Sequence, residues 1–213
     1  MRTTNSRLML DVDGFILTGG ASSRMGTDKA RLRLGGKTFV ERAEEALRAI
    51  TTRVCLVSAR MDGASSGLPV IKDIYLGRGA LGGLHATLKH GASQWVAVVP
   101  CDLPFVTGSL LKRLASFASE QFHAIAPMQA DGRPQPLCAL YRRDECLPVV
   151  EQLIRDGELR PRVLLERVRT CRVSFDELTD LDGASLFFTN INTPEDYDYA
   201  CRRESEGAVI ASS

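Results

Sequence analysis

The chain has 213 residues, and its 27 lysines and arginines nearly balance 26 aspartates and glutamates, giving a formal net charge of +1 at pH 7. This charge gives no bulk attraction to nucleic acid or an anionic membrane, so neither is expected as a partner. Six scattered cysteines without a CxxC pair, and no apolar stretch of membrane-spanning length, indicate a cytoplasmic protein. The length predicts one domain, residues 1–213, whose tail from about residue 204 is frayed.

Short apolar, β-branched runs alternate with helical patterns along the chain. Strands are expected at 15–18, 54–58, 69–73, 95–102, 123–128, 137–142, 170–175 and 186–191. Helix starts are signalled by a capping box at Thr38 and Glu41, by caps at Thr107 and Asp144, and by Thr193 before Pro194. Repeated strand–helix–strand units predict an α/β fold with a mostly parallel sheet covered by helices on both faces. Ligands of such sheets bind beyond the carboxyl ends of the strands.

The segment Ile16–Gly36 leaves the first expected strand and has the composition of a phosphate-binding loop. Gly19 and Gly20 permit a sharp turn and a close approach of the backbone to a ligand. Arg24 and Lys29 add fixed positive charge, the arginine as a fork and the lysine as a point charge. A glycine-containing turn with solvated basic residues is the alternative, but the density of the pattern favours a polyphosphate ligand.

Two standard phosphate motifs compete with this interpretation. A Walker A loop ending at GGKT, residues 35–38, fails because Arg31 stands where the first glycine must be. GRGALG at Gly77–Gly82 does match G-x-G-x-x-G, precedes an expected helix, and is followed by Asp102 about twenty residues later. A dinucleotide-binding half is therefore an open alternative, although it leaves the glycine and basic residues of the first loop unexplained.

Asp102 stands just past the strongly apolar run WVAVVP, where a carboxylate has no packing role. Mg²⁺ is commonly bound by one or two protein carboxylates together with substrate phosphates, so Asp102 is a candidate metal ligand, with a turn aspartate as the alternative. Asp73, at the end of PVIKD, has a similar but weaker signal. Asn190 and Asn192 precede Thr193-Pro194 and also fit ordinary turn and cap chemistry.

Six segments follow one another along nearly the whole chain: LTGGASSRMGTDKARLRLGGK, PVIKD, GALGGL, VVPCDLPFV, DGRPQPLCALY and NINTPEDY. In this order they resemble the molybdenum cofactor guanylyltransferases, within the nucleotidyltransferases of nucleotide-diphospho-sugar transferase type. The pattern LxGGxSxRMGxDKA is specific to this group, whereas DxP after an apolar strand is shared with its relatives. The resemblance implies a single-domain, Rossmann-like three-layer sandwich.

The same resemblance implies transfer of GMP from GTP to molybdopterin, with Mg²⁺, giving a guanine dinucleotide cofactor and pyrophosphate. It assigns the phosphates to Lys29 and the metal to Asp102, and the chemistry of nucleotidyl transfer assigns catalysis to Arg24, Lys29 and Asp102. It places the nucleotide against Leu17, Thr18, Gly19, Gly20, Lys29, Ser58, Asp73 and Asp102. Ser58 is a departure, because the family often has an asparagine there, which weakens the choice of guanine.

The pterin substrate is expected near Arg133 and Gln135, in a turn before a strand, and near Asn190 and Asn192. Proteins that deliver molybdopterin and chaperones of molybdoenzymes are candidate partners. Two other functions stay open from the sequence. One is a molybdopterin cytidylyltransferase or sugar-phosphate nucleotidyltransferase, and the other is a nucleotide-binding regulatory module without turnover.

Overall fold

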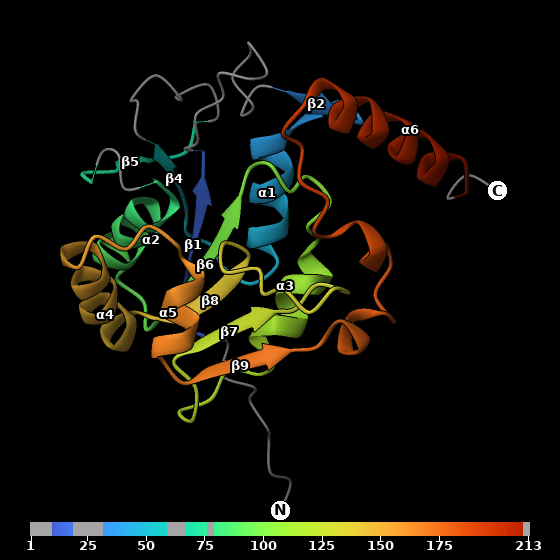
Figure 1. Cartoon of the computed structure of the whole chain (residues 1–213). Coiled ribbons are helices and arrows are strands. Elements are labelled where there is room, and N and C mark those ends of the chain that lie inside the picture. The colour runs from blue at the N-terminus through green and yellow to red at the C-terminus, as the bar shows by residue number, and fades with distance from the viewer. Residues whose placement is uncertain (1–9, 19–31, 59–66, 76–78, 211–213) are drawn as a thin grey trace, which may run out of the picture.

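A computed structural model describes residues 10–18, 32–58, 67–75 and 79–210, with side chains to residue 206. Its centre is a seven-stranded sheet in the order β5-β4-β1-β6-β8-β7-β9 (Figure 1). The strands are β1 Val12–Leu17, β4 Val54–Ser58, β5 Val70–Lys72, β6 Trp95–Pro100, β7 Ala124–Pro127, β8 Ala139–Arg142 and β9 Thr170–Val173. Only β8 runs antiparallel to its neighbours, β6 and β7, so the expected mostly parallel sheet is confirmed.

Helices cover both faces of this sheet, which makes the fold a three-layer α/β sandwich (Figure 1). On one face α1 (Phe39–Arg48) packs against α3 (Gly108–Ala115). On the other, α2 (Gly79–His90) packs against α4 (Arg143–Arg155), which contacts α5 (Arg162–Arg167). Outside the layers lie a two-stranded hairpin, β2 (Arg33–Leu34) and β3 (Lys37–Thr38), and the C-terminal helix α6 (Pro194–Ile210).

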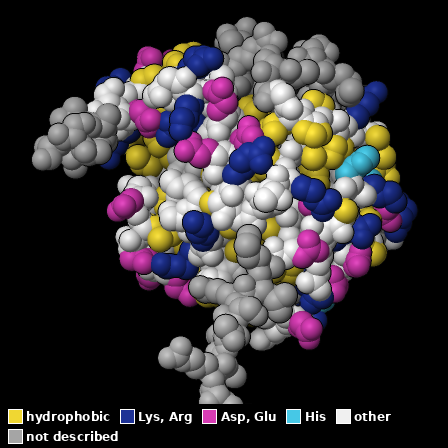
Figure 2. Space-filling model, turned by 180° about the vertical axis from the view of Figure 1, so that it is seen from behind, with side chains coloured by type: hydrophobic (Ala, Val, Ile, Leu, Met, Phe, Trp, Pro, Cys, Tyr) yellow, Lys and Arg dark blue, Asp and Glu magenta, His cyan; other side chains and the backbone are white. Residues whose placement is uncertain are grey.

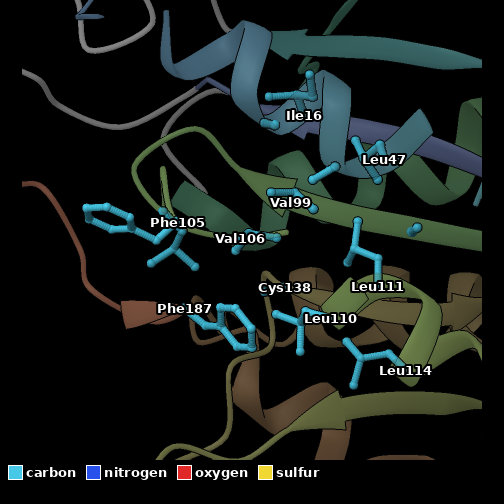
Figure 3. Close-up of a cluster of buried hydrophobic side chains, with 14 of the residues drawn as sticks. Ile16, Leu47, Val99, Phe105, Val106, Leu110, Leu111, Leu114, Cys138 and Phe187 are labelled. Carbon is cyan, nitrogen blue, oxygen red and sulfur yellow. The ribbon is translucent and has the colours of Figure 1, made fainter. Parts of the chain in front are cut away.

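The strands β1 and β6 are buried along their whole length. Successive side chains of a strand point to opposite faces of the sheet, and a hydrophobic cluster covers each face. Ile16 and Val99 face α1 and α3, in the cluster of Figure 3. Phe15 and Val98 belong to the second cluster, beneath α2 and α4. The two central strands are thereby fixed by packing on both faces, which gives a rigid base to the loops that follow them.

Several helix starts are confirmed. The Thr38 hydroxyl accepts a hydrogen bond from the Glu41 N–H, and the Glu41 carboxylate accepts one from the Thr38 N–H. Thr107 caps α3 through the Leu110 N–H, and Thr193 accepts from the Asp196 N–H ahead of α6. The cap expected at Asp144 is wrong. Strand β8 passes directly into α4, so the helix already begins at Arg143.

Two further expectations differ from the structure. Residues 186–191 form no strand: Gly183 has a left-handed φ of 77°, a 3₁₀ turn covers Ala184–Leu186, and the apolar run exists because Phe187 is a fully buried anchor of the core (Figure 3). The tail expected to fray from about residue 204 is helical to Ile210.

The surface agrees with the near-neutral charge of the chain. On the face seen in Figure 2, basic and acidic side chains are interspersed. Among the helices that the structure describes, none is long and apolar enough to cross a membrane.

Asp13 is a buried carboxylate near the amino end of β1. Its oxygens accept hydrogen bonds from the Ala92 N–H at 2.7 Å and from the Ser93 N–H and hydroxyl at 3.0 Å, and Arg53 forms an ion pair with it. Burial by itself raises the pKa of Asp13, but the donors of Ser93 and Ala92, with the charge of Arg53, outweigh it and leave the pKa below its ordinary value. The carboxylate therefore joins β1 to the loop between α2 and β6.

We predict that Asp13→Asn lowers the free energy of unfolding at pH 7 by about 2 kcal/mol, the scale of hydrogen bonds to a charged group. Because the folded pKa is depressed, the stabilisation by Asp13 is complete above the unfolded pKa of about 3.9 and is lost as pH falls through the folded value. Urea unfolding at pH 7 and pH 3 should therefore show the difference between wild type and variant shrinking in acid. An equal difference at both pH values would contradict this role.

Candidate active site

Polar residues follow four adjacent strands at one edge of the sheet. Thr18, Ser58, Asp73 and Asp102 stand at the carboxyl ends of β1, β4, β5 and β6, which are neighbours in the order β5-β4-β1-β6 (Figure 1). Backbone hydrogen bonds continue the pairing past the strands, from Asp73 N–H to the Ser58 carbonyl at 3.1 Å and from Thr18 N–H to the Val57 carbonyl at 3.0 Å. All four are half-buried, so they form a rim that a ligand can reach.

The end of β1 is held by both its neighbours. The Thr18 hydroxyl donates to the Val57 carbonyl at 3.0 Å, and the Leu17 carbonyl accepts from the Cys101 N–H at 3.0 Å. The Leu17 side chain is itself buried in the cluster beneath α2. The structure thus fixes the starting point of the glycine-rich loop. Gly19, Gly20, Arg24 and Lys29 lie outside the described residues.

Asp73 is seated against the first turns of α2. One carboxylate oxygen accepts a hydrogen bond from the Tyr75 N–H at 2.9 Å. A Cβ added to Gly82 would lie 3.0 Å from both Asp73 oxygens and 3.0 Å from the Tyr75 carbonyl oxygen. The last glycine of GRGALG therefore permits close approach of α2 to Asp73, a role that the spacing of the motif alone did not reveal.

The loop after β6 contacts the segment that leads into α6. The Asp102 carbonyl accepts a hydrogen bond from the Ile191 N–H at 3.0 Å, which brings Asn190 and Asn192 to the same end of the sheet as Asp102. Both asparagines are exposed. The Asn192 N–H donates to the Asp196 carboxylate at 2.9 Å, so this segment also begins α6.

Asp102 fits the donor set of a magnesium site in which substrate supplies most of the ligands. Within the described ranges no three His, Cys, Asp or Glu side chains are grouped so as to hold a metal ion. Mg²⁺ needs no such cage, because it takes one or two carboxylates and completes its coordination with phosphates and water. A single carboxylate at the strand end is chemically sufficient for this arrangement.

Arg133 and Gln135 lie in the turn between β7 and β8, where Gly132 adopts a left-handed φ of 79°. Arg133 is exposed, and its guanidinium is paired with Asp131 at 2.6 Å. Hydrogen bonds from the Arg133 side chain and backbone lower the pKa of the Asp131 carboxyl. The Gln135 N–H donates to the Pro127 carbonyl at 3.0 Å.

A hollow of about 410 Å³ separates this turn from the segment before α6. Its lining includes Gln129, Asp131, Phe175, Ser185, Phe188 and Thr189. Thr189 directly precedes Asn190, so the hollow opens between the turn that carries Arg133 and the segment that contacts Asp102. None of the four expected pterin-site residues lines the hollow itself: Arg133 lies two residues from the lining residue Asp131, and Asn190 lies next to the lining residue Thr189.

The chain is similar to known proteins in both its sequence and its fold. Residues 14–171 match the family model described as MobA-like NTP transferase domain. The chain is 34% identical over 191 residues to a probable molybdenum cofactor guanylyltransferase of Geobacillus sp., covering 87% of this chain and 95% of that protein. It is 33% identical to the molybdenum cofactor guanylyltransferase of Yersinia pestis, covering 88% and 94%. The crystal structure of molybdopterin-guanine dinucleotide biosynthesis protein A from Archaeoglobus fulgidus matches with a TM-score of 0.78 and 27% identity over 91% of this chain and 99% of that one.

We predict that Gly82→Ala weakens nucleotide binding, by about tenfold, because the new methyl group displaces Asp73 and the Tyr75 carbonyl. An ordinary glycine-to-alanine change inside a helix stabilises by about 1 kcal/mol, so a loss of stability would mark the clash. Gly83→Ala is the matched control, since its Cβ would meet only Leu17, at 3.4 Å. Thermal unfolding and GTP titration check both variants. Equal behaviour of the two would contradict the seating of Asp73 by Gly82.

Proposed function

Because this chain belongs to the MobA-like NTP transferase family, we propose that it transfers GMP from GTP to molybdopterin, releasing pyrophosphate and forming molybdopterin guanine dinucleotide. The observation that carries the proposal is the row of Asp73, Ser58, Thr18 and Asp102 along one edge of the sheet. We propose that the nucleotide binds along this row, beside the beginning of the glycine-rich loop. The segment Asn190–Asn192 and the hollow next to it leave room for a second substrate beyond Asp102.

The reaction needs groups that position substrates and neutralise charge. A phosphate oxygen of molybdopterin attacks the α-phosphorus of GTP, and the bond to the β-phosphate oxygen breaks as pyrophosphate leaves. We assign stabilisation of the leaving charge to Arg24 and Lys29, which the sequence places in the loop after β1. A phosphate monoester with a second pKa of about 6 is mostly dianionic near neutral pH, so no general base is required.

Asp102 is the residue proposed to hold Mg²⁺. When bound, the ion would neutralise phosphate charge and polarise the α-phosphoryl group. The chain fixes the position of this carboxylate in two ways. Asp102 follows the fully buried strand β6, and its backbone carbonyl accepts a hydrogen bond from the Ile191 N–H. Asp73 is proposed to contact the base or ribose of GTP. The hydrogen bond from the Tyr75 N–H holds its carboxylate at the far end of the same edge, where the absence of a side chain at Gly82 leaves room for it.

Molybdopterin is proposed to occupy the hollow between Asp131 and Thr189. Phe175 and Phe188 offer apolar surface there for a planar ring system. Arg133 offers positive charge for the phosphate, at the cost of its present pairing with Asp131. Gln135, Asn190 and Asn192 supply amide groups around this region.

Ser58 is the residue that leaves CTP open as an alternative to GTP. It replaces the asparagine often found in the family, so a cytidylyltransferase with the same fold and mechanism is the second candidate function. A cytoplasmic location and partners that deliver molybdopterin or receive the product stay predictions of the sequence.

Pyrophosphate release from GTP, CTP and ATP, each with Mg²⁺ and with or without molybdopterin, tests the proposal. We expect acceptor-dependent release from GTP alone. Preference for CTP would contradict GTP as the substrate and leave the proposed mechanism unchanged. Tight GTP binding without release from any nucleotide would favour a regulatory module.

We predict that Asp102→Asn lowers kcat by at least about 100-fold, the lower end of the loss when one group that stabilises transition-state charge is removed. The substitution keeps the size of the side chain and removes the charge proposed to hold Mg²⁺. GTP affinity measured without Mg²⁺ should change little. Unchanged turnover in this variant would contradict the role of Asp102.

A further inference from the structure

Arg42, on α1, joins three segments that are far apart in the sequence. Its Nε donates to the Pro104 carbonyl at 2.8 Å, and Nη1 donates to the Leu34 carbonyl at 3.1 Å. Nη1 and Nη2 also bind the two carboxylate oxygens of Glu204, at 2.6 and 3.1 Å. Only 19% of the Arg42 side chain is exposed, so these bonds are shielded from competing water.

Each of the three segments leads to the proposed active site. Pro104 lies two residues after Asp102, in the turn that follows β6. Leu34 belongs to the hairpin β2–β3, which follows the glycine-rich loop in the sequence. Glu204 lies on α6, which begins two residues after Asn192. One guanidinium therefore links the hairpin β2–β3 and the helix α6 to the turn that contains Asp102, the proposed metal ligand.

Contacts around Arg42 show that its arrangement is closely packed. A Cβ at Gly35 would clash with a Glu204 carboxylate oxygen, and the left-handed φ of 58° at Gly35 also favours glycine. The Tyr197 hydroxyl donates to the Arg33 carbonyl at 2.6 Å, a second tie between α6 and the hairpin. The guanidinium carbon of Arg42 lies 5.9 Å from the centre of the Phe105 ring.

We propose that Arg42 is a positioning residue for Asp102: by holding the Pro104 carbonyl, it fixes the turn after β6 relative to the hairpin and to α6. This inference rests on the proposed function, since it takes Asp102 as the metal ligand. Arg42 touches neither substrate nor metal in this assignment and acts through the backbone. Arginine is required because its rigid fork serves three acceptors in different directions, whereas a lysine amine on a flexible stem does not.

The test compares Arg42→Lys and Glu204→Gln with a matched control, Arg113→Lys. Arg113 also pairs through two nitrogens with a carboxylate, Asp180, at 3.0 and 2.7 Å, and donates to the Glu177 carbonyl. It ties α3 to the 3₁₀ helix Phe175–Leu178 and its neighbouring residues, and neither of these acceptors, Glu177 and Asp180, belongs to the turn after β6. Thermal unfolding, GTP affinity with and without Mg²⁺, and kcat are measured for each protein.

We expect Arg42→Lys to reduce the gain in GTP affinity that Mg²⁺ provides by about tenfold, the lower end of the loss when an outer partner of a metal ligand is removed. GTP affinity without Mg²⁺ should stay within about twofold, a change below 0.5 kcal/mol. Glu204→Gln keeps the bonds of Arg42 to Pro104 and Leu34 and should show a smaller loss in the same direction. Arg113→Lys should lose stability but keep the full effect of Mg²⁺.

A loss of stability in Arg42→Lys with an unchanged effect of Mg²⁺ would overturn the proposal and leave Arg42 a structural role only. If Arg42→Lys does not fold, the same comparison on Glu204→Gln decides. A wild-type protein whose GTP affinity gains nothing from Mg²⁺ would overturn the positioning role together with the metal role of Asp102. A wild type that shows the gain but releases no pyrophosphate would refute GMP transfer alone, while the effect of Mg²⁺ in the variants still tests Arg42.

Discussion

The candidate active site depends on one constraint: β5, β4, β1 and β6 are parallel neighbours, so their carboxyl ends meet at a single edge. Residues separated by up to 84 positions, from Thr18 to Asp102, thereby come to the same edge through the order of the strands. The buried strands β1 and β6 make this edge rigid, because side chains pack against helices from both faces. Loops can then carry the chemistry while the sheet sets the distances.

Two aspartates in or beside buried strands show how position on the same sheet decides the role. Asp13, near the amino end of β1, accepts three hydrogen bonds and pairs with Arg53, so its charge is committed to holding the structure together. Asp102 lies beyond the carboxyl end of β6, half-buried at the rim. In the sequence both are carboxylates next to apolar runs. The direction of the strands is what distinguishes the structural charge from the candidate ligand.

Local signals in the sequence predicted most of the central sheet and the helix caps at Thr38 and Thr107, since consecutive apolar residues and capping boxes act over a few residues. The run at 186–191 misled because apolar composition does not distinguish a strand from a turn that inserts Phe187 into the core. The strand order in the structure places Asp73 and Asp102 at one edge, where ligands of parallel sheets are expected to bind. The space that Gly82 leaves for Asp73 and the three acceptors of Arg42 depend on tertiary packing, which no local pattern encodes.

The C-terminal part of the chain completes the site although it lies beyond residue 171, where the match to the family model ends. Ile191 binds the Asp102 carbonyl, and Glu204 reaches the turn after β6 through Arg42. Neither contact adds a reactive group. Both restrict how far the turn that carries Asp102 can move relative to the hairpin, and an enzyme that works by positioning phosphates depends on such restriction. The helix outside the sandwich therefore belongs to the site through the geometry that it imposes, which explains why a segment so rich in charge is tied back to the core by a shielded arginine.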